Sequence, residues 1–150
     1  MSLVVLDGLR AAEVEWLVYV PSSGLDDVYE YFAQKDRAIC VTREEEAIAI
    51  VAGLTLNGKF GVPLIQQSGV GNCLNAVFTL AVPYEIEFPI LVYDRGVEDP
   101  NPVQAASSAL TNAALQPFDP CVVDLKTGSC AMKAIKDAVS CRKRWVICRS

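Results

Sequence analysis

The chain has 150 residues, 52% of them hydrophobic, with a positive mean hydropathy and a net charge of −5. This length predicts one domain with a real core, and no apolar run reaches the roughly 18 residues of a membrane span. The acidic balance makes nucleic acid and anionic membranes poor partners. Because no segment is long enough to span a membrane, we expect the apolar excess to form an oligomer interface.

The elements follow in a regular order along the chain. Six apolar segments predict strands at 16–20, 37–41, 62–66, 88–93, 121–124 and 145–148. Helical spacing predicts helices at 6–15, 25–34, 72–82, 103–115 and 129–139, and one more that begins at Glu44 and ends before Asn57-Gly58. Strands that alternate with helices predict an α/β fold with a six-stranded, mostly parallel, doubly wound sheet and helices on both faces.

The segment from Thr42 to Asn75 is the most informative part of the chain. Glu44, Glu45 and Glu46 begin a helix whose continuation, 47–54, is apolar on every side. A helix that is apolar all round is buried, so we expect a second chain to cover part of it. Thr42 is the expected N-cap, and Glu45 three residues later completes a capping-box pattern.

Histidine is absent, which excludes Ser-His and Cys-His nucleophile pairs and removes the commonest metal ligand. The six cysteines form no C-x-x-C pair, so no metal site is expected. The N-terminus carries no signal-peptide pattern. We therefore expect a cytoplasmic protein whose free thiols serve as small core residues.

Three polar segments directly follow predicted strands: the acidic helix start at Glu44, the turn 68–72 and the loop 94–96. The carboxyl ends of parallel strands lie at one edge of a sheet, where ligands of such folds bind. Helical residues are about 100° apart, so at most one of the three glutamates can face a given pocket. Simpler interpretations remain open, because acids cap helix starts, Gly-x-Gly can be plain turn chemistry, and Arg95 can be a surface residue.

These segments resemble a known family. The matching residues are Thr42-Arg43-Glu44-Glu45-Glu46-Ala47, Ala52-Gly53, Gln67-Ser68-Gly69-Val70-Gly71-Asn72 with Asn75, Pro89 and Tyr93-Asp94-Arg95-Gly96. They resemble the pyrimidine-binding domain of thiamine-diphosphate-dependent 2-oxo acid decarboxylases. The resemblance is strongest to the sulfopyruvate and phosphonopyruvate decarboxylase group, and within it to the separate alpha subunit of sulfopyruvate decarboxylase.

The resemblance implies roles for particular residues. A glutamate of this family hydrogen-bonds the pyrimidine ring of the cofactor and helps to form the imino tautomer that activates the thiazolium carbon for attack on a 2-oxo acid. The family spacing, nine residues before the helix glycine, assigns this role to Glu44. Residues implied to line the pyrimidine pocket are Gln67, Ser68, Gly69, Gly71 and Asn72. Arg95 is a weaker candidate for binding the sulfonate of the substrate.

The resemblance also implies what another chain must supply. The sequence has no counterpart of the Gly-Asp-Gly and later Asn that hold magnesium and diphosphate in the superfamily. The chain 1–150 is therefore expected to be a single pyrimidine-binding domain, with the diphosphate-binding domain and Mg²⁺ on a partner beta subunit. A hetero-oligomer is expected, and a homo-oligomer of the isolated chain stays open.

The expected reaction is decarboxylation of sulfopyruvate to sulfoacetaldehyde and carbon dioxide, active only with the partner. Phosphonopyruvate or another anionic 2-oxo acid is the nearest alternative substrate. Two alternatives of other classes are a non-catalytic interaction subunit with this fold and a flavodoxin-like nucleotide binder. The second is disfavoured because no phosphate-binding glycine fingerprint follows the first strand.

Overall fold

Six parallel strands form one sheet in the computed structural model, which describes residues 1–150. The strands are β1 (Trp16–Tyr19), β2 (Ala38–Cys40), β3 (Gly61–Gln66), β4 (Ile90–Asp94), β5 (Cys121–Asp124) and β6 (Trp145–Arg149). Their order across the sheet is β2-β1-β3-β4-β6-β5, and every neighbouring pair is parallel. The predicted α/β fold with a doubly wound sheet is therefore confirmed.

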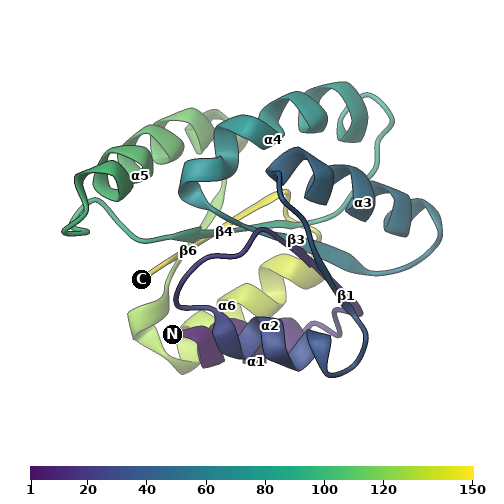
Figure 1. The fold of residues 1–150 in the computed structure, drawn as a ribbon, viewed down its shortest axis with the longest axis horizontal. Coiled ribbons are helices and arrows are strands. Elements are labelled where there is room, and N and C mark those ends of the chain that lie inside the picture. The colour runs from purple at the N-terminus through teal and green to yellow at the C-terminus, as the bar shows by residue number, and fades with distance from the viewer.

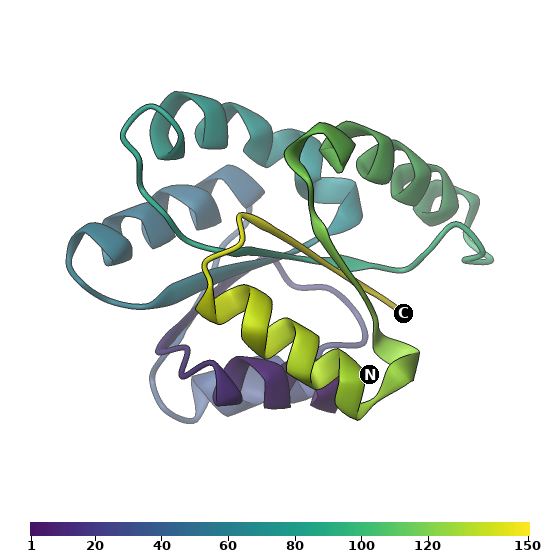
Figure 2. The same ribbon diagram turned by 180° about the vertical axis from the view of Figure 1, so that it is seen from behind.

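Helices cover both faces of the sheet in two layers (Figures 1 and 2). The helices are α1 (Ser2–Ala11), α2 (Asp26–Ala33), α3 (Glu44–Leu56), α4 (Val70–Ala76), α5 (Pro102–Leu115) and α6 (Ser129–Ser140). Figure 1 shows α1, α2 and α6 on one face and α3, α4 and α5 on the other. This arrangement creates two hydrophobic cores, one on each side of the sheet.

Alternation along the strands explains the two cores. Leu17 of β1 points into the core under α1, α2 and α6, whereas its neighbour Val18 points into the core under α3 and α4. Both side chains are fully buried. Because the inner part of the sheet is covered on both faces, β3, β4 and β6 are buried along almost their whole length and read as continuous apolar runs in the sequence. The edge strands β2 and β5 are only partly buried.

Three local predictions need correction. The first helix occupies Ser2–Ala11 and not 6–15, because Glu13 adopts a left-handed backbone conformation that ends the helix before β1. The expected helix 72–82 begins earlier and is irregular. A 3₁₀ turn at Gln67–Gly69 leads into α4, and a π-helical segment, Val77–Ala81, follows it.

The cap of α3 is also displaced by one residue from the predicted position. Arg43, not Thr42, is the N-cap residue. Glu46, not Glu45, supplies the capping carboxylate, since its Oε2 accepts hydrogen bonds from the backbone N–H groups of Thr42 and Arg43, both at 3.1 Å. Only the glutamate half of a capping box therefore exists in this helix, one residue later than predicted, because the Arg43 side chain makes no cap hydrogen bond and has no acceptor atom.

Helix α3 is buried on one side only within this chain. Ala47, Ile48, Val51 and Ala52 are buried against the sheet and α4, whereas Ala49 and Leu56 are exposed. The prediction that a second chain covers the rest of α3 therefore stays a prediction, and the uncovered side remains apolar.

Two glycines in helices permit a matched test of packing. A Cβ added at Gly8 of α1 would lie 2.7 Å from Ile135 Cγ2 of α6, whereas one added at Gly53 of α3 would meet nothing within 4 Å. We expect Gly8→Ala to lower the free energy of unfolding by about 1–3 kcal/mol through overpacking. Gly53→Ala should raise it by about 0.5–1 kcal/mol, because alanine loses less backbone entropy than glycine in a helix. Urea denaturation of both variants measures this, and effects of the same sign would contradict the packing of α1 on α6.

Candidate functional site

Three polar segments meet at the carboxyl edge of the sheet, as the sequence predicts. The start of α3 follows β2, the 3₁₀ turn Gln67–Gly69 follows β3, and Asp94 ends β4. The strand order places β2 and β3 on opposite sides of β1, so the chain reverses its direction of winding here. Such a switch point opens a crevice beyond the strand ends, and that crevice is where ligands of doubly wound folds bind.

Glu44, at the start of α3, reaches the turn that follows β3. Its Oε2 accepts a hydrogen bond of 2.8 Å from Asn72 Nδ2, although the two residues belong to different helices. Gly69 lies directly beneath the carboxylate, and a Cβ at that position would overlap the Glu44 side chain. The residue is only partly buried. A carboxylate that is held between two helix starts and is only partly buried can donate a proton to, or accept one from, a ligand bound at this edge.

The other two glutamates are committed to local structure. Glu46 caps α3, and Glu45 Oε1 accepts a 2.6 Å hydrogen bond from Arg43 Nε. The structure therefore separates the three carboxylates as their angular spacing requires. Only Glu44 reaches the turn at Gly69 and Asn72.

Gln67 is almost fully buried behind this edge. Its Nε2 donates to Gln104 Oε1 at 2.8 Å, and its backbone carbonyl accepts a 2.7 Å hydrogen bond from Thr111 Oγ1. Gln66 Nε2 donates to the same Gln104 oxygen at 2.9 Å. Gln104 thus ties the end of β3 to α5, which fixes the turn that carries Ser68 and Gly69.

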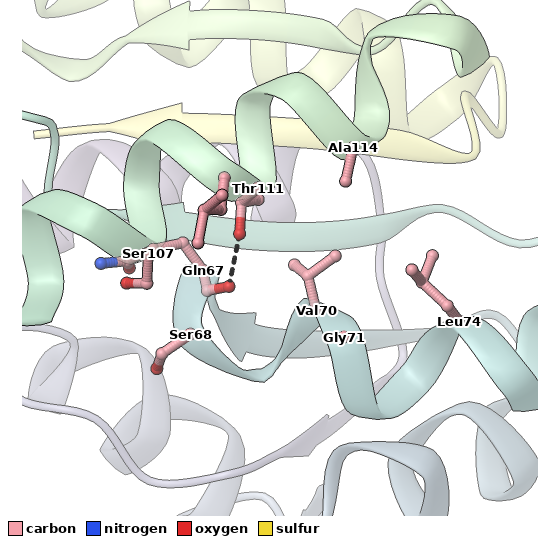
Figure 3. A pocket seen from close by; sticks show the side chains of 9 residues that line it. Gln67, Ser68, Val70, Gly71, Leu74, Ser107, Thr111 and Ala114 are labelled. Atoms are coloured by element: carbon pink, nitrogen blue, oxygen red, sulfur yellow. Dashed lines mark hydrogen bonds between the residues drawn. The ribbon is translucent and has the colours of Figure 1, made fainter.

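A cavity of about 210 Å³ lies between α4 and α5. Figure 3 shows side chains from both helices around it, together with the hydrogen bond from Thr111 to Gln67. Its nine lining residues are Gln67, Ser68, Val70, Gly71, Leu74, Ser107, Leu110, Thr111 and Ala114. None of these side chains is charged.

The structure therefore divides the predicted site residues into two groups. Glu44, Gly69 and Asn72 lie together between the starts of α3 and α4. Gln67, Ser68 and Gly71 line the cavity on the other side of α4, toward α5. The 3₁₀ turn is the wall that both groups share.

Arg95 begins the loop after β4. Its Nε donates a 2.8 Å hydrogen bond to Asp99 Oδ2, and about one third of its side chain is exposed. Its backbone N–H points to Gln67 Oε1 at 3.4 Å. The guanidinium is therefore near the edge but already paired with a carboxylate, so binding a substrate anion would have to compete with Asp99.

Asp94 is a buried carboxylate that sequence reasoning noted only as part of a motif. Burial raises the pKa of this carboxyl, but hydrogen bonds from Ser108, Gly96, Asn112 and Arg149 lower it more, so its net pKa lies below the usual 3.8. Arg149 Nε lies 3.2 Å from Asp94 Oδ2. The cluster joins β4, β6 and α5 beneath the loop that carries Arg95.

This pKa shift predicts a pH-dependent contribution to stability. Because the folded-state pKa is depressed, the contribution is present above pH 4 and is lost as the pH falls through the folded pKa. We expect Asp94→Asn to lower the free energy of unfolding by about 1–3 kcal/mol at pH 7, and by less as the pH falls below about 4. Denaturant unfolding from pH 7 to 3 measures this, with Asp137→Asn on the exposed side of α6 as the control. A cost that does not change with pH would contradict the assignment.

The thiols only partly follow the sequence-based expectation. All six cysteines are free; Cys73 and Cys148 are buried core residues, and burial raises the pKa of each to about 12. The prediction is wrong for Cys40, Cys130 and Cys141, which are exposed. No helix of the chain combines the length and the apolarity needed to cross a bilayer.

Comparison with solved structures identifies the fold of the chain. No protein-family model matches it. A 2-oxoglutarate:ferredoxin oxidoreductase from Magnetococcus marinus shares its fold with a TM-score of 0.64 and 18% sequence identity, and the match covers 99% of this chain and 28% of that one. A split-gene transketolase described as an inactive beta4 tetramer shares it with a TM-score of 0.60 and 15% identity, and that match covers 99% of this chain and 50% of the other. The chain is thus an α/β domain of the kind found in these two enzymes.

Curated relatives identify the family. The sulfopyruvate decarboxylase alpha subunit of Methanococcus maripaludis is 34% identical over 91% of this chain and 84% of its own length. That of Methanothermobacter thermautotrophicus is 37% identical over 65% and 60%. A phosphonopyruvate decarboxylase of Streptomyces viridochromogenes is 38% identical over 40% and 15%. The chain belongs to the family of sulfopyruvate decarboxylase alpha subunits, which confirms the resemblance recognised in its sequence.

Proposed function

We propose that this chain is the pyrimidine-binding alpha subunit of a thiamine-diphosphate-dependent decarboxylase that converts sulfopyruvate to sulfoacetaldehyde and carbon dioxide. The observation that carries the proposal is the position of Glu44, which stands at the switch point of the sheet with Asn72 and Gly69 around its carboxylate. Family membership supplies the reaction class, and this geometry supplies a residue able to perform the proton transfer.

The residues at the edge fit an aminopyrimidine ring. Glu44 offers one carboxylate to a ring nitrogen, Asn72 fixes the position of that carboxylate, and the missing side chain at Gly69 leaves the room it occupies. Bound thiamine diphosphate would supply the electron sink for the electrons that carbon dioxide leaves behind. The chain's own share is to bind and orient the ring and to hold or move a proton at Glu44 Oε1 or Oε2.

The diphosphate requires positive charge that this edge does not offer freely. Arg43 is paired with Glu45 and Arg95 with Asp99. We therefore assign magnesium and diphosphate binding to a partner chain, with 1–150 as a single pyrimidine-binding domain. The names of the relatives in Methanococcus and Methanothermobacter, each a subunit alpha, support a two-subunit enzyme.

Reconstitution with the partner tests the proposal. The chain is mixed with a diphosphate-binding protein, and carbon dioxide release from sulfopyruvate is measured with thiamine diphosphate and Mg²⁺ added or withheld. We expect activity only when both chains and both cofactors are present. Activity of either chain alone, or activity without thiamine diphosphate, would overturn the division of labour.

The same assay separates the nearest alternative, which the phosphonopyruvate decarboxylase relative favours. Phosphonopyruvate carries a phosphonate where sulfopyruvate carries a sulfonate, and the two groups differ in charge and shape. A larger kcat/KM for sulfopyruvate supports the proposed substrate. A larger value for phosphonopyruvate would keep the mechanism and replace the substrate.

A further inference from the structure

Three glutamine side chains meet at the carboxyl end of β3. Gln66 is the last residue of that strand, Gln67 begins the 3₁₀ turn, and Gln104 lies in the first turn of α5. Gln104 Oε1 accepts a hydrogen bond of 2.9 Å from Gln66 Nε2 and one of 2.8 Å from Gln67 Nε2. A carbonyl oxygen has two lone pairs, so these two bonds use its whole acceptor capacity.

Main-chain groups fix the direction of this network. The oxygen and nitrogen of a side-chain amide can exchange places by a half turn, so their positions must be inferred from their partners. The backbone N–H of Arg95 points to Gln67 Oε1, and Gln67 Nε2 points to the backbone carbonyl of Gln104, both at 3.4 Å. A backbone N–H can only donate and a carbonyl can only accept. Gln67 must therefore present its NH₂ group to the Gln104 side chain, which must answer with its oxygen.

Gln104 consequently holds a hydrogen-bond donor that the chain does not use. Both hydrogen bonds of its side chain go through Oε1, so Nε2 faces away from the other two glutamines. This nitrogen is not sealed inside the protein, because the buried side-chain atoms without a partner are Ser2 Oγ and Glu45 Oε2. A donor that is already held in place loses little further freedom when it binds an acceptor.

The charges around Gln104 suit a ligand group with a single negative charge. The two arginines that follow β4 and end β6 are both paired, Arg95 with Asp99 and Arg149 with Asp94. A sulfonate carries one charge and only accepts hydrogen bonds, so a neutral amide N–H can bind it. A phosphonate carries close to two charges near neutral pH, as phosphate groups do, and would need a free cation.

We propose that Gln104 Nε2 binds the sulfonate of the substrate and favours it over a phosphonate. This inference rests on the proposed function and deepens it, because it assigns the substrate's second anionic group to a particular donor. The sulfonate keeps its charge throughout the reaction, whereas the carboxylate loses its charge as carbon dioxide leaves. A donor to the sulfonate therefore stabilises the bound substrate and the transition state alike, and its removal should raise KM much more than it lowers kcat.

Gln104→Glu separates binding from positioning. Glutamate has nearly the same shape and can still accept hydrogen bonds from Gln66 and Gln67, so the 3₁₀ turn should stay in place. An ionised carboxylate has no donor, however, and it repels an anion. Gln116→Glu is the matched control, because it makes the same substitution on an exposed residue at the far end of α5.

Binding can be measured without the reaction. The probe is 3-sulfopropionate, which has the sulfonate and a carboxylate but no 2-oxo group. Calorimetric titration uses the chain reconstituted with its diphosphate-binding partner, thiamine diphosphate and Mg²⁺. The Kd should be about 10–100-fold larger for Gln104→Glu than for the wild type, as expected when a charged group loses a hydrogen bond. Gln116→Glu should change the Kd by less than about 2-fold, because distant exposed charges are screened.

Two further measurements complete the test. The wild type should bind 3-phosphonopropionate more weakly than 3-sulfopropionate, and KM for sulfopyruvate should rise in Gln104→Glu by about the same factor as the Kd. Equal Kd values for the wild type and Gln104→Glu, no binding of 3-sulfopropionate to the wild type, or tighter binding of the phosphonate would each overturn the proposal. So would a fall in kcat with an unchanged KM, because Gln104 would then only position the turn.

The outcomes distinguish this proposal from the proposed reaction. A complex that binds 3-sulfopropionate through Gln104 but releases no carbon dioxide from sulfopyruvate keeps the sulfonate site and contradicts the reaction. A complex that decarboxylates sulfopyruvate equally well with Gln104→Glu keeps the reaction and overturns the site.

Discussion

Glu44→Gln is expected to reduce turnover of the reconstituted enzyme by about 10²–10⁴-fold while leaving assembly intact. Glutamine has nearly the same shape and can still contact Asn72, which lies 2.8 Å from the Glu44 carboxylate. It cannot exchange a proton near neutral pH, however. The loss should therefore appear in kcat, measured as carbon dioxide release with saturating cofactor, and not in the mass of the complex.

Glu45→Gln is the matched control for this experiment. Glu45 is the next residue on the same helical turn, and its carboxylate contacts Arg43 and not the turn at Gly69. We expect near-normal turnover from this variant. Equal losses in the two variants would mean that the acidic start of α3 acts as a whole, and near-normal turnover in Glu44→Gln would remove the catalytic assignment.

The sequence predicted the fold well because buried strands leave apolar runs that can be recognised without the structure. A parallel sheet covered on both faces leaves long apolar runs, and the predicted strand 145–148 lies within β6, where all four of these residues are buried. Helix ends were less predictable. The first helix ends early because of the backbone conformation at Glu13, and the cap of α3 is one residue later than predicted because Glu46 reaches back further than Glu45 does.

The meeting of Glu44 with the glycine turn was also predictable, since parallel strands bring their carboxyl ends to one edge. The division of the pocket residues by α4 was not. It depends on two residues of α5 that are far from Gln67 in the sequence: Gln104, which accepts hydrogen bonds from the Gln67 side chain, and Thr111, which donates one to the Gln67 backbone carbonyl. No local pattern in the sequence marks Gln104, because its role depends on a long-range contact.

Exposed apolar side chains help to explain the high apolar content that the sequence shows. A chain that is 52% hydrophobic has more apolar residues than its two cores hold. Leu56 on α3 and Val103 and Leu110 on α5 are among the most exposed large apolar side chains, but Leu3 on α1 and Tyr84 are exposed as well. Apolar surface therefore occurs on both layers, and the prediction that a second chain covers part of α3 stays a prediction.

Gly69→Ala should inactivate the enzyme with little loss of stability. Gly69 has a φ of −93°, which alanine adopts without strain, so the backbone should not change. The added Cβ would instead overlap the Glu44 side chain and push its carboxylate away from Asn72. A displacement of about 1 Å in a catalytic group costs on the order of 10²-fold in rate, so we expect kcat to fall by about that factor.

Stability separates this explanation from simple misfolding. The Glu44 side chain is partly exposed and can rotate away from a new methyl group. The free energy of unfolding of Gly69→Ala should therefore change by less than about 1 kcal/mol. Gly8→Ala differs, because its new methyl group meets a buried side chain of α6. Combining Gly69→Ala with Glu44→Gln should cost little more than Glu44→Gln alone, because both changes remove the same carboxylate from its position. Fully multiplicative losses in the double variant would show that Gly69 acts on the reaction by a route that does not pass through Glu44.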